Sequence, residues 1–446
     1  MNKLYKLIII LGLILFSPAI FAQSNTKFYS LDECIKMALE HNYELDNARK
    51  ELKISYNKKL ELKTKYFPTL SADVMAYQSN NPLIDDKLNL SMLNIPNIPI
   101  KLLKKGYLAS LVAVEPIFNG KRIVIANKLA EVGKESSSLL VRKSEKEIKE
   151  TTEVYFWKII NLKEKRKILE SQAKLLKQLH HDVSLAVKVG VINRNDLLRV
   201  ELQEQRIESG FVTIDHAIEL SKLVLMQYIG IMDRGNEFEI ENSYFPNIED
   251  PIKYRKLPHE AVYSRVEFAL LNKKLLASKL QKKLEFGKYL PQFAVGASLT
   301  QFNLLDLSSF MDEDFKAVQR RALVFATLKI PISSWWGGSH ALIQKKLAID
   351  KAKNELKNGE ELMELEIIQT WNALSEAYDQ IQIAKKSILS SKENLRLNKD
   401  TYSAGTTTMA DLLDAQMLVQ ESENQLTEAK TNYMIAWAKY RRITME

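Results

Sequence analysis

The feature that most constrains the fold is a pair of very long heptad repeats. The first seam has an apolar or aromatic residue at every seventh position: Val141, Ile148, Tyr155, Leu162, Leu169, Leu176 and Val183. The second seam has the same spacing: Ile367, Leu374, Ile381, Ile388, Leu395 and Tyr402. Sustained heptads are typical of coiled-coil packing against neighbouring helices. A single helix over 121–188 would be about 100 Å long, which no compact globular domain needs.

Two segments with strand periodicity precede these helices. "YFPTLSADVMAY" occupies 66–77 and "YLPQFAVGASLT" occupies 289–300, and each follows a charged stretch patterned like a helix. In both segments apolar residues alternate with small or polar ones, which predicts a strand with one apolar face. Such a strand suits a wall between lipid and water. The soluble alternative is the edge of a β-sandwich, but the sequence offers no second sheet.

Landmarks recur at a nearly constant spacing, which predicts a tandem duplication. Gly190 and Gly405 are 215 residues apart, and Tyr66 and Tyr289 are 223 apart. We expect a first repeat over 23–230, a linker over 231–256 and a second repeat over 257–446. Each repeat is expected to contain a first helix (31–65 and 257–288), a β-hairpin (66–118 and 289–333), a long helix (121–188 and 339–403) and a closing helix (195–230 and 410–443).

The N-terminus has the pattern of a secretory signal peptide over residues 1–22. Lys3 and Lys6 precede an apolar run that starts at Leu7, and Ala22 stands before the expected cleavage site at Gln23. No later stretch reaches ~18 uninterrupted apolar residues, so we expect no transmembrane helix. The sequence therefore predicts an exported protein.

Composition and motifs argue against nucleic-acid binding and against catalysis. The formal charge is +9, but basic and acidic residues alternate, as in "RKSEKEIKE", which is typical of solvated helix faces. Cys34 is the only cysteine and is expected to be a packed thiol. No phosphate-binding glycine loop, HExxH motif or cysteine cluster occurs. Adjacent His180 and His181 point apart on a helix and are expected to be solvated. We expect no metal, no cofactor and no enzyme activity.

Four strands cannot close a β-barrel. The smallest barrels have about eight strands, and an open sheet edge cannot face hydrocarbon. Copies of the chain must therefore share one wall. Two copies would contribute about eight strands and three would contribute about twelve, both of which are even numbers.

These features together resemble the TolC family of outer-membrane factors, over roughly residues 30–443. The resemblance rests on "LDECIKMALEHNYEL", on the two aromatic-x-Pro strand entries, on "EPIFNG" and on "YSAGTTTMADLLDAQ" at 402–416. It implies an α+β membrane protein in the outer membrane of a Gram-negative bacterium. A homotrimer would form a shared twelve-stranded β-barrel that continues as a long α-helical coiled-coil barrel in the periplasm. The loops at about 79–105, with the apolar stretch near 92–100, and at 303–320 would face outward.

The resemblance also implies a function and its partners. The chain would be the exit duct of a tripartite efflux pump, working with a periplasmic adaptor and an inner-membrane transporter. The exit duct of a type I protein secretion system is an alternative within the same family. A periplasmic coiled-coil structural or adaptor protein is an alternative of another class, which would explain the heptads but not the paired hairpins.

Aromatic and proline residues mark the expected passage from tunnel to barrel. Tyr66 with Pro68, and Tyr289 with Pro291, stand where the helices end, because proline fixes φ and an aromatic side chain suits the lipid–water boundary. Trp335 and Trp336 stand at the return junction. They serve either the same boundary role or a packed elbow.

Two carboxylates are candidates for a gate at the periplasmic aperture. Asp411 and Asp414 are three residues apart at a helix start, so they share one face. By resemblance this face lines the closed aperture, where copies from several chains would attract cations and raise some of their own pKa values. The alternative is that Asp411 only faces the helix N-terminal dipole.

The turns at the periplasmic end supply the remaining candidates. By resemblance Asn195, Asp196 and Tyr402 match latch positions, whereas Thr407 stands where some members have an arginine. Arg194 or Arg199 would then supply the missing cation, or the closed state is held differently. Gly190 and Gly405 are expected at tight turns that partner proteins approach, which is compatible with an ordinary helix C-cap.

Overall fold

The computed structural model describes residues 27–81, 84–88, 98–232, 238–241, 245–305 and 318–445. The expected signal peptide and most of the apolar stretch near 92–100 lie outside these residues. The chain divides into two compact units. The helical unit comprises Met1–Asp46, Glu145–Leu257 and Ile367–Glu446, and the sheet unit comprises Asn47–Ser144 and Pro258–Glu366.

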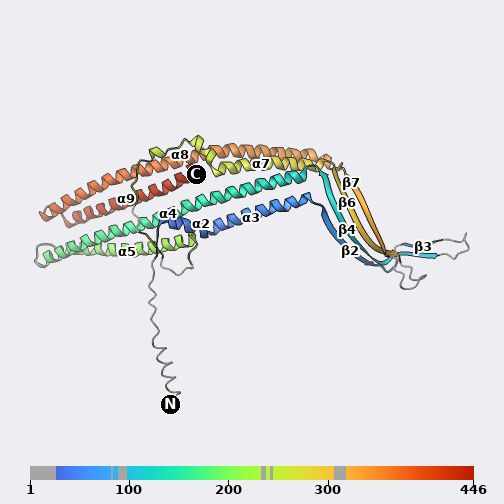
Figure 1. The fold of residues 1–446 in the computed structure, drawn as a ribbon. Coiled ribbons are helices and arrows are strands. Elements are labelled where there is room, and N and C mark those ends of the chain that lie inside the picture. Colours follow the sequence, from blue (N-terminus) through green and yellow to red (C-terminus); the bar gives the residue numbers. More distant parts are fainter. Residues whose placement is uncertain are drawn as a thin grey trace, which may run out of the picture. The chain divides into compact units, whose positions relative to one another are not determined.

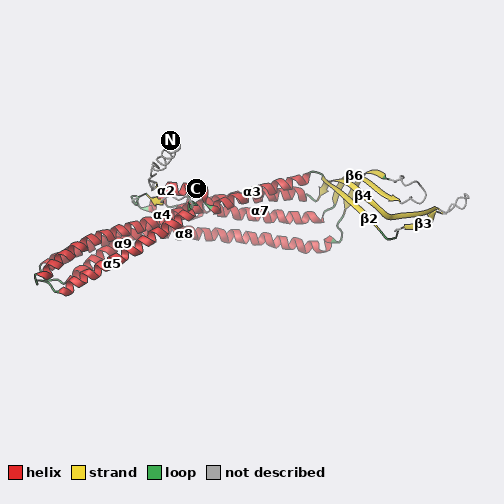
Figure 2. Ribbon diagram, turned by 90° about the horizontal axis from the view of Figure 1, so that it is seen from below, coloured by secondary structure: helices red, strands yellow, loops and turns green. Residues whose placement is uncertain are grey.

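The fold is predominantly helical with an antiparallel sheet, which confirms the predicted α+β class (Figures 1 and 2). The α-helices are α2 (Leu31–His41), α3 (Tyr43–Lys63), α4 (Arg122–Lys188), α5 (Arg194–Tyr228), α6 (Pro258–Ser264), α7 (Val266–Phe286), α8 (Ser334–Ser403) and α9 (Met409–Thr444). The strands are β1 (Lys27–Tyr29), β2 (Thr69–Gln78), β3 (Ile84–Leu88), β4 (Ile98–Asn119), β5 (Phe238–Ile240), β6 (Gln292–Leu305) and β7 (Gln319–Lys329). Short 3-10 helices are η1 (Thr64–Tyr66), η3 (Pro251–Tyr254) and η4 (Gly287–Tyr289).

The expected single helices over 31–65 and 257–288 are each interrupted. Asn42 separates α2 from α3, because its Oδ1 accepts hydrogen bonds from the backbone N–H groups of Glu44 (2.9 Å) and Leu45 (3.3 Å). A side chain that caps α3 in this way favours the start of a new helix over the continuation of α2. Arg265 separates α6 from α7 with an extended backbone (φ −74°, ψ 139°), and its guanidinium bonds to Glu366.

In the sheet unit the main path of the sheet runs β2-β4-β6-β7, with antiparallel neighbours throughout. The second strand of the first hairpin is longer than expected: β4 spans 22 residues and begins at Ile98, inside the segment of about 79–105 that was expected to be a loop. Its first part pairs with β3, a strand within the segment expected to be a loop. Pro99 in β4 pairs with Lys87 of β3, beyond the stretch that β2 and β6 cover, and proline is tolerated where a strand lacks a second neighbour.

In the helical unit α5 runs back alongside α4, and α9 runs back alongside α8, so that both turns lie at the same end (Figures 1 and 2). The predicted heptad seams supply much of the core. Ile148, Leu176 and Val183 of α4 are buried, as are Ile367 and Leu374 of α8. Leu176 and Val183 pack into a cluster near the turns, and Leu374 packs into a second cluster that includes Tyr433 and Tyr440 of α9. The heptads therefore identify the packed faces of the long helices.

The expected linker over 231–256 contains a strand that the sequence analysis missed. β5 pairs in parallel with β1 over three residues, which places Lys27–Tyr29 beside the linker residues Phe238–Ile240. Tyr29 of β1 stacks on Phe238 of β5, with ring centroids 5.1 Å apart. Three-residue strands give too weak a periodicity to be recognised in a sequence.

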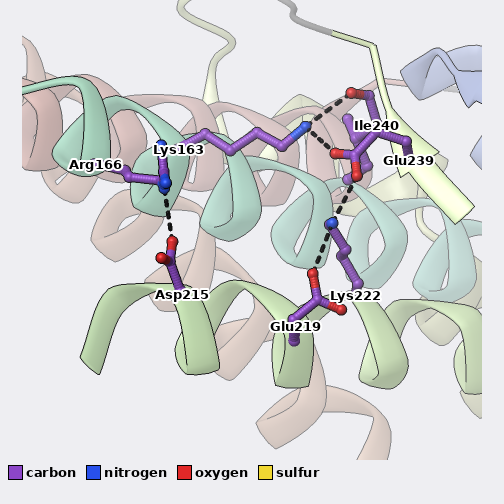
Figure 3. A network of polar contacts seen from close by, with 7 residues as sticks. All are labelled: Lys163, Arg166, Asp215, Glu219, Lys222, Glu239 and Ile240. Atoms are coloured by element: carbon purple, nitrogen blue, oxygen red, sulfur yellow. Dashed lines mark hydrogen bonds and ion pairs between the residues drawn. The ribbon is translucent and has the colours of Figure 1, made fainter. Parts of the chain in front are cut away.

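Lys163, Lys222 and Glu239 form an ionic clamp that holds β5 to the helices α4 and α5. Figure 3 shows Lys163 from α4 and Lys222 from α5 reaching the Glu239 carboxylate from two sides. Lys163 also donates to the Ile240 carbonyl at 2.9 Å, and Lys222 donates to Glu219 at 2.9 Å. Nearby, Arg166 donates to Asp215 at 2.6 Å, a second bridge between α4 and α5. Lys163 and Lys222 are largely buried, with side chains 15% and 12% exposed.

The clamp also sets the protonation of its carboxylate. Burial by itself raises the pKa of Glu239, but the hydrogen bonds from Lys163 and Lys222 outweigh it and hold this pKa below its ordinary value. A lowered folded-state pKa contributes stability above the unfolded pKa, and this contribution is lost as the pH falls through the folded pKa. The clamp therefore works at neutral pH and releases in acid.

We predict that Glu239→Gln loosens the β1–β5 pair by about 2 kcal/mol at neutral pH, because two charged lysines lose their shared anion. Hydrogen exchange at β1 and β5 measures this opening. The wild type should approach the variant as the pH is lowered toward about 3. Glu219→Gln is the control, because Glu219 is 68% exposed and contacts only Lys222 of the clamp. Equal protection of wild type and Glu239→Gln at neutral pH would contradict the clamp.

Candidate functional site

The antiparallel sheet has two chemically different faces. Its register places apolar and small side chains of one face in two continuous rows across all four main strands, whereas the next row on that face, which begins with Val74 and Ala109, ends in Gln301 and Arg320. We call this the apolar face; its apolar and aromatic members are Leu70, Ala72, Val74, Ala76, Tyr107, Ala109, Leu111, Ala113, Val295, Ala297, Leu299, Ala322, Val324 and Ala326. Val74 and Val324 are 79% and 82% exposed, so nothing in the chain's described residues covers the face there. An exposed apolar sheet face is what contact with lipid requires.

The opposite face carries most of the polar residues of the sheet. One row across the four strands consists of Asp73, Ser110, Thr300 and Arg321. This face also carries apolar side chains, among them Val112, Leu323 and Phe325. A Cβ on Gly296 would lie only 2.4 Å from the Phe325 ring, so this ring fills the space above the glycine. The face opposite the apolar one is therefore mixed, with a polar row at Asp73 and Arg321.

Both outer strands of the sheet have an unpaired edge. Within the described residues, β2 pairs only with β4 and β7 pairs only with β6. These edges are 10 and 11 residues long, and residues of the apolar face lie along both. A long edge with exposed apolar side chains is a template for pairing with another strand.

The two helix-to-strand junctions have the same local geometry. Tyr66 and Tyr289 each end a 3-10 turn, and the residue before each proline is extended, as a following proline favours (Phe67 φ −99°, ψ 157°; Leu290 φ −85°, ψ 151°). Pro68 and Pro291 then lead into β2 and β6.

The tryptophans near the return junction lie inside α8 rather than before it. Trp335 Nε1 donates to the Tyr289 carbonyl at 2.9 Å and so braces the second junction, as a packed elbow would. Trp336 is 81% exposed and has no such role within the chain. Two glycines that were not singled out bring the junctions together: a Cβ on Gly120 would lie 2.1 Å from the Gly287 carbonyl oxygen.

The turns at the end of the helical unit are both built on glycine. Gly190 and Gly405 have φ of +78° and +74°, a conformation that favours glycine. In each turn the glycine N–H and the next N–H bond back to the helix, which is a Schellman motif (Gly405 to Tyr402, Thr406 to Thr401). Asn193 caps the helix that follows the first turn, a residue that the sequence analysis passed over in favour of Asn195 and Asp196.

Asp411 belongs to a capping box at the start of α9. Its carboxylate accepts from the Thr408 hydroxyl (2.6 Å) and backbone N–H (3.1 Å), while its own N–H donates to that hydroxyl. These hydrogen bonds lower the pKa of Asp411. Within one chain the pKa of Asp411 is therefore lowered, whereas the carboxylates of several chains in one ring were expected to raise it. Asp411 and Asp414 are both exposed.

Tyr402 lies near Asp196, whereas the candidate cations Arg194 and Arg199 pair with neither of them in the described part of the chain. Burial and the nearby Asp196 carboxylate raise the pKa of Tyr402. Thr407 donates to Thr401 at 2.8 Å, within its own turn. Arg194 and Arg199 are exposed and form no ion pair within the part of the chain that is described.

The histidine pair differs from the expectation of solvated side chains. His180 is half-buried, and its Nδ1 lies 3.0 Å from Glu204 of α5. His181 is exposed. Among the described residues no group of three or more His, Cys, Asp or Glu side chains is arranged to hold a metal ion. No described helix combines the length and hydrophobicity that crossing a membrane would need.

Comparison with known proteins gives a family and a fold. Residues 265–444 match the family of outer membrane efflux proteins. Among curated proteins, none matches this sequence. The outer membrane protein VceC of Vibrio cholerae is 12% identical, with a TM-score of 0.75 over 93% of this chain and 95% of VceC.

Two solved outer membrane channels are similar to the same extent. The CmeC channel of Campylobacter jejuni is 14% identical, with a TM-score of 0.75 over 93% of this chain and 85% of CmeC. The MtrE channel of Neisseria gonorrhoeae, solved in its open state, is 16% identical, with a TM-score of 0.71 over 93% of this chain and 88% of MtrE. Residues 265–444 therefore match the outer membrane efflux proteins, and the chain as a whole shares the fold of these solved outer membrane channels.

Proposed function

We propose that three copies of this chain form a channel in the outer membrane that acts as the exit duct of a tripartite efflux pump. The observation that carries the proposal is the open, two-faced sheet with two unpaired edges. In hydrocarbon every backbone N–H and C=O must find a partner, so β2 of one copy would pair with β7 of the next.

The number of copies follows from the width of the pore. Two copies would give about eight strands, and the interior of such a barrel is filled by side chains. Three copies would give about twelve strands and leave a passage. The apolar face would then contact lipid, and the row of Asp73, Ser110, Thr300 and Arg321 would face the lumen. The passage would be passive, because the chain has no catalytic motif to drive transport.

We infer that the turns of the helical unit form the periplasmic aperture. Asp411 and Asp414 are exposed on one helix face, available to line a constriction. Tyr402 beside Asp196 is the candidate latch, and Thr407 takes no part in it because its hydroxyl bonds within the turn. The Trp336 side chain, exposed at the start of α8, would serve the lipid boundary together with Tyr66.

The same end offers a surface for a partner. Val189 and Val191 flank Gly190 and are 74% and 78% exposed, which is unusual for valines in a helix turn. We propose that a periplasmic adaptor covers them and links the duct to an energised inner-membrane transporter. The efflux assignment of the family favours a pump over a protein secretion system.

We also propose that the chain arose by tandem duplication. The helix interruptions at Asn42 and Arg265 are 223 residues apart, the spacing that separates Tyr66 from Tyr289. The Asn42 side chain caps the helix that follows it, whereas the Arg265 side chain does not, so no shared capping signal accounts for the two interruptions. Their equivalent positions therefore support a common origin of the two halves.

The shared barrel predicts disulfides between copies. We combine Ser71→Cys on β2 with Leu323→Cys, Phe325→Cys or Thr327→Cys on β7, all on the polar face. At least one combination should give a ladder of cross-linked bands that ends at three copies on a denaturing gel. The native Cys34 will not interfere, because it is fully buried and burial raises its pKa to about 12.

Leu70→Cys with the same β7 cysteines is the matched control. Leu70 adjoins Ser71 but points to the opposite face, so it should give no ladder. The absence of any ladder, or one that continues past three copies, would contradict the closed trimer.

The gate assignment predicts a change in cation block. Asp411→Asn with Asp414→Asn should raise the Gd³⁺ concentration for half block of the channel by about tenfold, because the local anionic field is lost. Conductance in planar bilayers measures this. Thr408→Ala removes the helix cap but keeps both carboxylates, so block should stay at the wild-type level. If Thr408→Ala weakens block as much as the double variant, the carboxylates act through the cap and the gate assignment is wrong.

Deletion of the gene separates the two duct functions. An efflux duct predicts greater susceptibility to antimicrobial compounds or metal ions with an unchanged secreted proteome. A secretion duct predicts the loss of particular secreted proteins with unchanged susceptibility. The latter result would overturn the efflux proposal and leave the channel itself in place.

A further inference from the structure

The apolar face of the sheet ends in a polar cluster at the end of the strands that lies farthest from the helices. β7 leads into α8 at its C-terminal end, so its first residues mark that far end. Taken from the helices outward, the β7 side chains on this face are Leu328, Ala326, Val324, Ala322 and Arg320. Four apolar residues therefore give way to an exposed arginine.

Three side chains at this end are linked by hydrogen bonds. Arg320 Nε donates to Gln301 Oε1 at 3.1 Å, and Gln301 Nε2 donates to the Tyr107 hydroxyl oxygen at 3.0 Å. We call Tyr107, Gln301 and Arg320 the rim cluster. Among the described residues only the Nε of the guanidinium is engaged, so its two Nη groups remain free to donate, as does the Tyr107 hydroxyl.

No carboxylate of the same face lies near the rim cluster. Arg320 forms no ion pair with any residue that the structure describes. Glu115 is the acidic member of this face among the described side chains, and it shares a row with Val295 and Ala326. That row is three rows nearer the helices than Arg320, about 20 Å away along the strand. The guanidinium therefore has no anion on its own part of the face.

The neighbouring copy would not supply the anion either. This step and the inference rest on the proposed function, in which β7 pairs with β2 of the next copy. The β2 side chains on the apolar face are Leu70, Ala72, Val74, Ala76 and Gln78. Asp73, the carboxylate of β2, belongs to the opposite face. The described strands thus leave Arg320 to find its anion outside the protein.

The rim cluster lies where the hydrocarbon of the membrane would end. Phe293 and Leu328 form the row of the apolar face nearest the helices, and Tyr107 pairs with Asn303 at the far end. Ten residues of β6 separate the two rows, about 33 Å along the strand. A tilt of about 40° shortens this to about 25 Å along the membrane normal, the height of the apolar band between the aromatic girdles of an outer-membrane barrel. An arginine on the lipid face costs little at that depth, in contrast to the midplane.

We propose that the rim cluster binds the phosphate of an anionic lipid headgroup. The Arg320 Nη groups donate to two phosphate oxygens, the paired geometry in which arginine recognises phosphate. The Tyr107 hydroxyl donates to the same headgroup, and Gln301 positions the guanidinium by holding its Nε. The acyl chains of this lipid cover the apolar rows between Arg320 and the helices. A zwitterionic headgroup fits less well, because its own ammonium group neutralises the phosphate.

Native mass spectrometry of the full-length protein tests this site. The protein in an uncharged detergent is titrated with phosphatidylglycerol or with phosphatidylcholine of the same acyl chains, and the lipids bound to each assembly are counted. Phosphatidylglycerol should bind about tenfold more tightly, as one charge-assisted hydrogen bond implies.

Two adjacent arginines provide the variant and its matched control. Arg320→Gln should remove most of the preference for phosphatidylglycerol. Arg321→Gln should keep the preference, because Arg321 is also exposed on β7 but belongs to the opposite face. Tyr107→Phe removes one neutral hydrogen bond and should lower the affinity for phosphatidylglycerol about fivefold.

The possible failures can be told apart. A trimer that binds both lipids equally, or that keeps its preference in Arg320→Gln, would overturn the inference and leave the channel in place. A preference lost in Arg321→Gln but not in Arg320→Gln would place lipid on the opposite face, and would overturn both the inference and the proposed orientation of the sheet. A monomer that retains neither lipid would overturn the proposed function itself.

Discussion

The requirement that every backbone hydrogen-bonding group in hydrocarbon be satisfied governs the architecture of this protein. Four main strands with an apolar face across them satisfy this requirement everywhere except at two edges, on β2 and β7. A soluble protein would cover or charge such edges. Here apolar side chains lie along both, including Leu70 and Val324. The sheet of one chain therefore leaves two edges unpaired, and these edges are the reason that the proposed channel needs several copies.

The long helices are held together by ordinary coiled-coil packing. Their seams bury Ile148, Leu176 and Leu374 as any coiled coil would, and charged residues cover the remaining faces. Where more elements converge, the heptad gives way to denser packing: Phe156, Ile159 and Ile160 are fully or almost fully buried although they lie off the seam. The C-terminal end of α9 is anchored in this region, because Arg441 and Arg442 pair with Glu153 and Glu150 of α4. Polar pairs at this density fix the alignment of long helices, which apolar seams alone leave free to slide.

The turns at Gly190 and Gly405 have the same backbone geometry but different neighbouring side chains. Both use a glycine with positive φ and a Schellman motif, and both are followed by a capped helix. The first exposes Val189 and Val191, whereas the second places Tyr402 at a cavity and Asp411 in a capping box. Turn chemistry thus sets the geometry, and the few side chains around it distinguish the roles proposed for each.

The sequence by itself determined the strand entries, the long helices and the resemblance to outer membrane efflux proteins, because these depend on periodicity, proline and glycine, which act locally. A strand was expected in the segment 66–77, and β2 lies at Thr69–Gln78. Contacts between distant residues were decided only by the tertiary structure. Three features join segments up to 211 residues apart: the pairing of β1 with β5, the clamp of Lys163, Lys222 and Glu239, and the approach of Gly120 to Gly287. No local pattern encodes such contacts, since each partner has an ordinary sequence environment until the fold brings the two together.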